Sequence, residues 1–306
     1  MKNLKIITVV LLIGLLILSF LMLNQKAETE GKKPIVAVTT FALYDITKHI
    51  AQDSVELVNI LPFGVDPHSF EPTPKLMAKI EKSSLVIYSG AGLEPWVHGF
   101  NFHAKAINMS QYVNLRSLTK GEHHEGEHSH SGVDPHYWLD FSNMQKATKV
   151  ITEALIKLLP QKRAFYKKNE AKYIAMLQNL DKLYREKLSS CKLKSVVVSH
   201  NALGYLARNY GFHVESLTGL SPEAQPSAKD VTRIMQDIKK EHISTIFFEH
   251  FVNDNVIKRI AKDTDIQLDV FQPLGNITKD EAEAHLSYED IMKRNLKKLS
   301  KALLCH

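Results

Sequence analysis

The sequence predicts an α/β fold of two (β/α) lobes with parallel-rich sheets, joined by one long rigid backbone helix. Short apolar runs alternate with helix-periodic segments along most of the 306 residues, which is the pattern of parallel strands with crossover helices. This alternation stops between Ser142 and Ser190, where only helical periodicity remains. The chain is also longer than one small hydrophobic core usually serves, which favours two lobes.

The strand candidates are short, apolar and bounded by turn or polar residues. Such runs suit strands that are buried on both faces of a parallel sheet. They are Pro34–Thr40, Val55–Leu61, Ser84–Ser89, Ser195–Ser199, Thr245–Phe248 and Gln267–Phe271.

Helical periodicity marks the segments between these strands and the stretch that joins the lobes. After Pro160 the apolar residues recur at helical spacing and predict a helix of about 28 residues, roughly 42 Å long. A helix of that length spans both lobes. The shorter candidates are Ala42–Ala51, Pro74–Lys82, Leu203–Tyr210, Ser227–Glu241 and Asn255–Asp263.

The first residues predict export from the cytoplasm. Lys2 and Lys5 precede an uncharged run from Ile6 to Leu23, and polarity then returns. At 18 residues this run is at the lower edge of what spans a bilayer, so both a cleaved signal and a retained membrane anchor remain open. No cysteine follows the run that could be lipidated. We therefore expect a periplasmic protein.

Four segments follow from these patterns. Residues 1–33 form the signal or anchor with a polar linker, and residues 34–141 form the N-terminal lobe with a His-rich loop at 119–133. Residues 142–190 form the linking helices, and residues 191–306 form the C-terminal lobe.

Charge and cysteine content argue against two classes of function, nucleic-acid binding and cysteine-based metal or redox chemistry. Without residues 1–27 the chain keeps 36 basic and 33 acidic side chains, a net charge of +3. This gives no reason to expect a nucleic-acid partner. Cys191 and Cys305 could pair in an oxidising compartment, but the sequence leaves open whether they are close enough. Their spacing does not indicate a cysteine-based zinc or redox motif.

Three histidines, each following an aspartate-proline pair or a serine, indicate a metal site. They are His68, His136 and His200, separated by 68 and 64 residues. His68 lies in the loop after a predicted strand and His200 directly follows another. The carboxyl ends of strands are where open α/β sheets bind ligands. Because imidazole nitrogen suits zinc and similar divalent metals, we expect the metal in the cleft between the lobes.

Five motifs, in order and spacing, resemble the extracytoplasmic solute-binding proteins of zinc- and manganese-type ABC importers. The resemblance covers nearly all of the chain beyond residue 33. It implies two (β/α) lobes joined by one long helix, with a metal that is held by His68, His136 and His200 and passed to a membrane permease. Histidine at the third position favours zinc over manganese. The motifs are LPFGVDPHSFEPTP (Leu61–Pro74), DPHYWLD (Asp134–Asp140), SHNALGYLARNYGF (Ser199–Phe212), GLSPEAQPS (Gly219–Ser227) and QPLG (Gln272–Gly275).

The fourth metal position departs from the family pattern. Members of the family usually carry Asp directly before Pro-Leu-Gly, and this chain carries Gln272. Three imidazoles and an amide would leave the charge of the metal uncompensated. Glu249, at the end of a predicted strand, is an alternative ligand, as is water or hydroxide. The sequence leaves these candidates open.

A histidine-rich tract, Glu122–His130, precedes the second ligand motif. Its histidines predict weak accessory metal binding, because such tracts have little to bury and stay mobile. The resemblance adds that zinc-type members often carry a His-rich insertion at this place. The four histidines are His123, His124, His128 and His130.

We therefore expect the high-affinity zinc-binding component of an ABC importer, a monomer that delivers Zn(II) to a permease. The chain has no phosphate-binding loop, so the ATPase subunit is expected to be another chain. Alternatives are a manganese or other divalent-metal binding protein and a zinc chaperone of the same fold. A zinc hydrolase fits less well, because the sequence has no HExxH or other general-base motif. We expect no enzymatic activity.

Overall fold

The structure is a computed structural model that describes residues 32–118, 132–220, 222, 224–250 and 255–306. The predicted export segment lies outside the described residues except for its last two positions, and the His-rich tract Glu122–His130 lies outside them entirely. Among the residues that the structure describes, no helix combines the length and apolar character that a membrane crossing requires.

A four-stranded parallel sheet forms the N-terminal lobe, with strand order β2-β1-β3-β4. Three of its strands are the apolar runs that the sequence predicts. The fourth was missed, because only its two central residues are apolar. The strands are β1 (Ile35–Val38), β2 (Glu56–Asn59), β3 (Leu85–Tyr88) and β4 (Lys105–Asn108).

A second parallel sheet forms the C-terminal lobe, with strand order β8-β7-β9-β10. Counted along its own lobe, each sheet has the order 2-1-3-4, so the first strand of each sheet lies between the second and third. Ligands of open α/β sheets bind beside such a strand. Sequence reasoning missed β8, whose first half carries polar residues. The strands are β7 (Ser195–His200), β8 (His213–Thr218), β9 (Thr245–Phe248) and β10 (Gln267–Val270).

Crossover helices connect the strands of both lobes, as predicted, and several carry clear N-terminal signals. In α3 the side chain of Thr73 accepts a hydrogen bond from Leu76 N, and Pro74 occupies the first turn. In α7 Ser227 and Asp230 form a reciprocal capping box. The helices are α2 (Phe41–Ala51), α3 (Pro74–Glu81), α6 (Gly204–Tyr210), α7 (Ala228–Lys240) and α8 (Asn255–Thr264).

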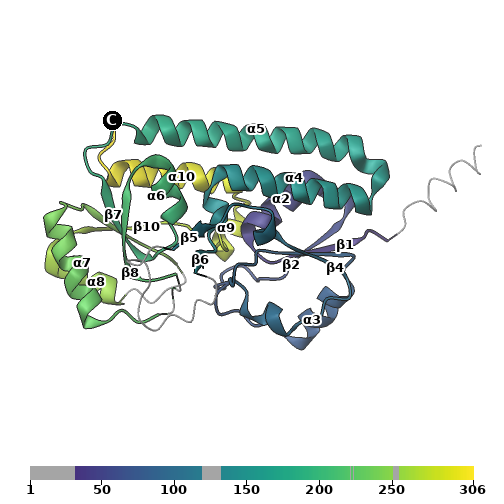
Figure 1. The fold of residues 1–306 in the computed structure, drawn as a ribbon, viewed down its shortest axis with the longest axis horizontal. Coiled ribbons are helices and arrows are strands. Elements are labelled where there is room, and N and C mark those ends of the chain that lie inside the picture. Colours follow the sequence, from purple (N-terminus) through teal and green to yellow (C-terminus); the bar gives the residue numbers. More distant parts are fainter. Residues whose placement is uncertain (1–31, 119–131, 221, 223, 251–254) are drawn as a thin grey trace, which may run out of the picture.

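The predicted long helix is confirmed as α5 (Arg163–Leu188), which spans both lobes. Its 26 residues correspond to about 39 Å. In Figure 1, α4 (Phe141–Leu158) lies along its N-terminal-lobe half and α10 (Tyr288–Ala302) along the other half. The three helices pack through one continuous apolar core that also reaches both sheets. Sequence reasoning identified no helix at α10.

The segment after β10 crosses back to the N-terminal lobe before the short helix α9 (Lys279–Glu283). Phe41 N donates to Gly275 O at 3.0 Å, and Gly64 N donates to Ile277 O at 2.9 Å. The amide of Asn276 donates to two carbonyls of the loop before His68, Pro62 O and Val65 O, both at 2.7 Å. This crossing segment therefore braces the loop that carries His68. The predicted division into residues 34–141, 142–190 and 191–306 remains a prediction.

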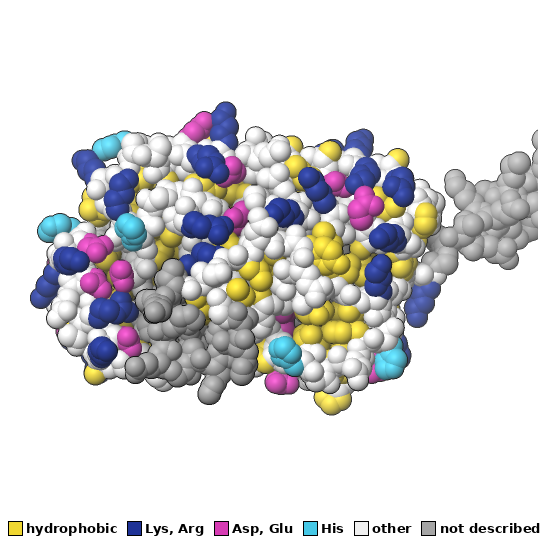
Figure 2. All heavy atoms as spheres, viewed as in Figure 1, with side chains coloured by type: hydrophobic (Ala, Val, Ile, Leu, Met, Phe, Trp, Pro, Cys, Tyr) yellow, Lys and Arg dark blue, Asp and Glu magenta, His cyan; other side chains and the backbone are white. Residues whose placement is uncertain are grey.

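Cys191 and Cys305, whose pairing the sequence left open, form a disulfide in the structure. It joins the residues just after α5 to the residues just after α10, and therefore fastens the two long helices together at one end. Figure 2 shows the charged surface of one face of the molecule. Lysine and arginine side chains are interspersed with acidic ones there and do not gather into one basic patch.

Candidate metal centre

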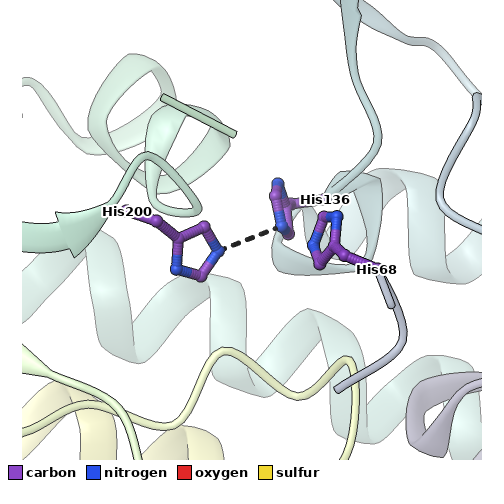
Figure 3. A group of neighbouring side chains, drawn as sticks. All are labelled: His68, His136 and His200. Atoms are coloured by element: carbon purple, nitrogen blue, oxygen red, sulfur yellow. Dashed lines mark hydrogen bonds between the residues drawn. The ribbon is translucent and has the colours of Figure 1, made fainter. Parts of the chain in front are cut away.

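The three predicted histidines converge between the two lobes. His68 lies in the loop after β2, His136 lies between β6 (Val133–Asp134) and the turn Tyr137–Leu139, and His200 is the last residue of β7. One ring nitrogen of each histidine lies within 4.8 Å of the others. The Nε2 atoms of His200 and His136 are 3.4 Å apart, and Figure 3 shows the His200 ring facing the other two. Within the described part of the chain, this is the one such group of metal-ligand side chains.

His136 is held by the aspartate that precedes it by two residues. Asp134 is fully buried, and its Oδ1 atom accepts a hydrogen bond from His136 N at 2.9 Å. The same oxygen lies 2.8 Å from ring atom Nδ1 of His136. A carboxylate at Nδ1 requires the proton on that nitrogen, which leaves the Nε2 lone pair directed at the other two rings.

His200 is paired with Glu249, which directly follows the neighbouring strand, β9. Ring atom Nδ1 of His200 is in ion-pair contact with Glu249 Oε1, and Ser199 Oγ donates to the same oxygen at 3.3 Å. Burial by itself would lower the pKa of His200. The negative charge of Glu249 and its contact with the ring outweigh burial and raise the pKa above its ordinary value.

His68 has the opposite electrostatic environment. Its backbone N donates to Asp66 Oδ1 at 2.8 Å, which fixes the turn that presents the ring. Burial, followed by the proximity of His136 and His200, holds the pKa of His68 well below its ordinary value. His68 is therefore neutral near pH 7, and its lone pair is available to a cation.

A small cavity of about 20 Å³ separates the histidines, which is room for about one ion or water molecule. Trp138 covers one side: its ring centroid is 5.4 Å from that of His136, and its Nε1 donates to Pro273 O at 2.6 Å. The crossing segment closes another side. The lining residues are Asp66, Pro67, His68, His136, Trp138, His200, Pro222, Glu249, Pro273, Gly275 and Asn276.

The two candidates for the fourth metal ligand lie in different places relative to the cavity. Glu249 lines the cavity. Gln272 is buried elsewhere: its Nε2 donates to Glu281 Oε2 at 2.8 Å, and its Oε1 accepts from Leu274 N at 3.3 Å. Gln272 is absent from the cavity lining, so its amide points into a hydrogen-bond network of the crossing segment.

The residues that flank the histidines have three different roles. Asp134 contacts the imidazole ring of its histidine, whereas Asp66 accepts from the backbone and Ser199 donates to Glu249. Sequence reasoning missed Asn276, which braces the His68 loop, and Arg116, which pairs with Asp134 at 2.8 Å. The position of Asn276 directly after the QPLG motif was the one available signal. Nothing in the sequence singles out Arg116.

Three imidazoles around a small cavity form a donor set for a borderline divalent metal such as zinc. The accessory histidines His123, His124, His128 and His130 lie outside the described residues.

The sequence matches one protein family over most of its length. The family model of the periplasmic zinc-uptake complex component A (ZnuA) matches residues 36–302.

Individual relatives agree with this match. The chain is 36% identical to the high-affinity zinc uptake system protein ZnuA of Bacillus subtilis over 288 residues, 91% of this chain and 90% of that protein. It is 34% identical to the zinc-binding lipoprotein AdcA of Streptococcus pneumoniae, covering 90% of this chain but 56% of that longer protein. The crystal structure of the Zn(II)-bound ZnuA-like domain of that AdcA superposes with a TM-score of 0.74 at 32% identity, covering 89% of this chain and 99% of that domain.

Proposed function

The chain belongs to the family of the periplasmic zinc-uptake complex component A, and from this we propose that it captures Zn(II) with His68, His136 and His200 for delivery to a membrane permease. It is the zinc-binding component of an ABC uptake system and not an enzyme. One observation supports the choice of these ligands: three imidazoles from two lobes converge around a cavity the size of one ion.

The chemistry of the donor set supports zinc as the transported ion. Zinc is usually held by four ligands in tetrahedral geometry, of which three can be histidines, whereas manganese prefers oxygen ligands. Asp134 and Glu249 each hold a ring nitrogen of a proposed ligand, which directs the opposite nitrogen to the ion. The fourth position is left for water or for an oxygen of Glu249, which lines the cavity but lies outside the close group of ring nitrogens. The engagement of Gln272 with Glu281 argues against Gln272 in this role.

The partners and location follow from the transport function. Zinc is the cargo, and a separate permease and ATPase complete the importer. The protein works outside the cytoplasmic membrane. In this proposal it acts as a monomer and has no nucleic-acid partner. Whether residues 1–33 are cleaved or retained as an anchor decides whether the protein is tethered. Mass determination of the mature protein purified from its own cells distinguishes the two forms.

The His-rich tract Glu122–His130 adds weak zinc sites in this proposal. Deleting residues 122–130 is expected to remove one or more weak zinc equivalents from a calorimetric titration and to leave the tight site nearly intact, because histidine-rich tracts of this composition bind metal weakly. A single tight isotherm in both the intact and the deleted protein contradicts the accessory sites.

The test of the main site is metal analysis followed by competition titration against a chromophoric chelator. The purified protein is expected to carry about one tightly held zinc. His68→Ala, His136→Ala and His200→Ala are each expected to weaken zinc binding by at least tenfold, or about 1.4 kcal/mol. His213→Ala is the matched control, because His213 is exposed at the start of β8. Wild-type zinc affinity in any of the three variants removes that residue from the site, and stronger binding of manganese than of zinc refutes zinc as the cargo.

A further inference from the structure

Arg116 binds the carboxylate of Asp134, and this carboxylate in turn contacts the His136 ring. It lies on β5 (Arg116–Ser117), which pairs with β6, the strand that ends at Asp134. Its Nε and Nη2 atoms donate to Asp134 Oδ2 at 3.1 and 2.8 Å. The other carboxylate oxygen, Oδ1, serves the backbone and ring of His136. The carboxylate is therefore held at both ends, by a guanidinium on one side and a proposed zinc ligand on the other.

The guanidinium of Arg116 packs against Gly204 of the C-terminal lobe, a residue that has no side chain. A Cβ atom added to Gly204, the first residue of α6, would lie 2.0 Å from Arg116 Nη2. The next residue, Tyr205, accepts a hydrogen bond from Arg116 N at 2.9 Å and donates to Asp134 O at 2.8 Å. The orientation of His136 in one lobe thus depends on a close contact with a helix of the other lobe.

Because the side chains of Arg116 and Asp134 are little exposed, the loss of one should change the position of the other. Asp134 is fully buried and the side chain of Arg116 is 12% exposed. Removing the guanidinium leaves the buried Asp134 carboxylate without its partner at Oδ2, so nothing on that side fixes its orientation. Rotation of the carboxylate withdraws the acceptor from Nδ1 of His136 and frees the ring to turn away from the other two histidines.

We propose that Arg116 is a positioning residue for zinc binding, which acts through Asp134 on His136 and requires glycine at position 204. The proposal rests on the proposed function, because His136 must be a zinc ligand. Arg116 itself does not line the cavity between the three histidines. Its fork-shaped guanidinium holds the carboxylate in the orientation in which Oδ1 meets the imidazole.

The test is the zinc affinity of a small set of variants, measured by competition with a chromophoric chelator. Arg116→Ala is expected to weaken zinc binding about 10- to 100-fold, the usual effect of losing a residue that supports a metal ligand. Arg116→Lys keeps the charge but not the fork and is expected to recover part of the loss. Gly204→Ala is expected to weaken zinc binding from the other lobe, because the added methyl displaces the guanidinium.

Gly204→Ala separates positioning from a general loss of stability. Alanine is a better helix former than glycine, which offsets part of the cost of displacing the guanidinium from the buried carboxylate. The unfolding midpoint of zinc-free Gly204→Ala should therefore fall less than that of Arg116→Ala, while its zinc affinity, measured well below that midpoint, still falls. In an Arg116→Ala background, Gly204→Ala should have no further effect on affinity, since its target is already gone. The matched controls are Gly99→Ala, where an added Cβ meets no atom within 4 Å, and Arg208→Ala, whose guanidinium lies 5.2 Å from the Tyr205 ring centroid but pairs with Asp140.

The zinc affinities of these variants separate a failure of the proposed zinc site from a failure of the role of Arg116. If the wild-type protein binds no zinc, or His136→Ala binds zinc as tightly as wild type, the proposed function fails and the inference fails with it. If His136→Ala weakens binding but Gly204→Ala and Arg116→Lys keep wild-type affinity, the zinc site stands and the role of Arg116 is refuted. An equal effect of Gly204→Ala with and without Arg116 also refutes it.

Discussion

Glu249 contacts the Nδ1 atom of His200 from the adjacent strand of the C-terminal sheet, while the Nε2 atom of the same ring faces His136 at 3.4 Å. The pair arises from the strand order, because β7 and β9 are neighbours and both residues lie at their carboxyl ends. The first strand of this sheet, β7, therefore places the proposed ligand His200, and its neighbour β9 places the carboxylate that contacts the ring.

Glu249→Gln is expected to weaken zinc binding by about tenfold or more. The substitution keeps the size of the side chain but removes the charge that stabilises the ring and offsets the charge of the ion. A competition titration at pH 7 measures the change. Glu283→Gln is the control, because Glu283 is exposed on α9. An affinity equal to wild type would mean that Glu249 neither binds the ion nor orients His200.

Gln272→Asp tests the other candidate for the fourth position. Gln272 is 2% exposed, and its amide donates to Glu281 Oε2. An aspartate there would lose this donor and place a second carboxylate near Glu281 in a buried setting. We expect no gain in zinc affinity and a lower unfolding midpoint, which a thermal melt of the zinc-free protein measures. Tighter zinc binding by this variant would contradict the arrangement and restore position 272 to the site.

The sequence was sufficient to predict the strands and histidines that are marked by short local patterns. Buried parallel strands are short apolar runs, so β1, β2 and β7 could be predicted, and the carboxyl-end rule applied to β2 and β7 then led to His68 and His200. It was insufficient for β8, because only two of its six residues are apolar and the strand lacks a continuous apolar run. It also could not show that Gln272 turns toward Glu281, because that contact depends on where α9 packs.

Contacts between distant segments were the least predictable part of the site. Arg116 reaches Asp134 only because β5 and β6 pair, and its fit against Gly204 depends on the packing of the two lobes. Asn276 supports His68 from more than 200 positions away in the sequence, through the carbonyls of Pro62 and Val65. No local pattern records such contacts.

The disulfide between Cys191 and Cys305 is expected to contribute to stability but not to zinc affinity. It closes a loop of 114 residues, and restricting so long a loop in the unfolded chain corresponds to about 4–5 kcal/mol by the chain-entropy model. The double variant Cys191→Ser/Cys305→Ser should lose a few kcal/mol of this in a denaturant titration. The pair lies beyond the ends of α5 and α10, and neither cysteine lines the metal cavity, so zinc affinity should stay unchanged. A variant with wild-type unfolding free energy would show that the unfolded chain gains little freedom when the bond is removed.

The last prediction concerns a buried carboxylate that joins three helices at a distance from the zinc site. Asp45 of α2 accepts hydrogen bonds from Tyr173 OH of α5 at 2.7 Å and from Tyr288 N of α10 at 3.3 Å. His49, one turn further along α2, has its Nδ1 atom 3.3 Å from Asp45 Oδ2. The interaction with the Asp45 side chain raises the pKa of His49 above its ordinary value, although partial burial opposes the shift.

A raised pKa in the folded state means that folding favours the protonated ring. This contribution to stability is fully present below about pH 6.5, the ordinary value for histidine, and is lost as the pH rises through the higher folded-state value. Because the His49 side chain is 47% exposed, the effect should be small. We expect zinc-free His49→Gln to melt below wild type at pH 5.5 and to approach it by pH 9, with His213→Gln, at an exposed position, as the control for losing a histidine. A difference in melting temperature that is constant with pH, or that grows toward pH 9, would show that the proton on His49 does not stabilise the junction of α2, α5 and α10.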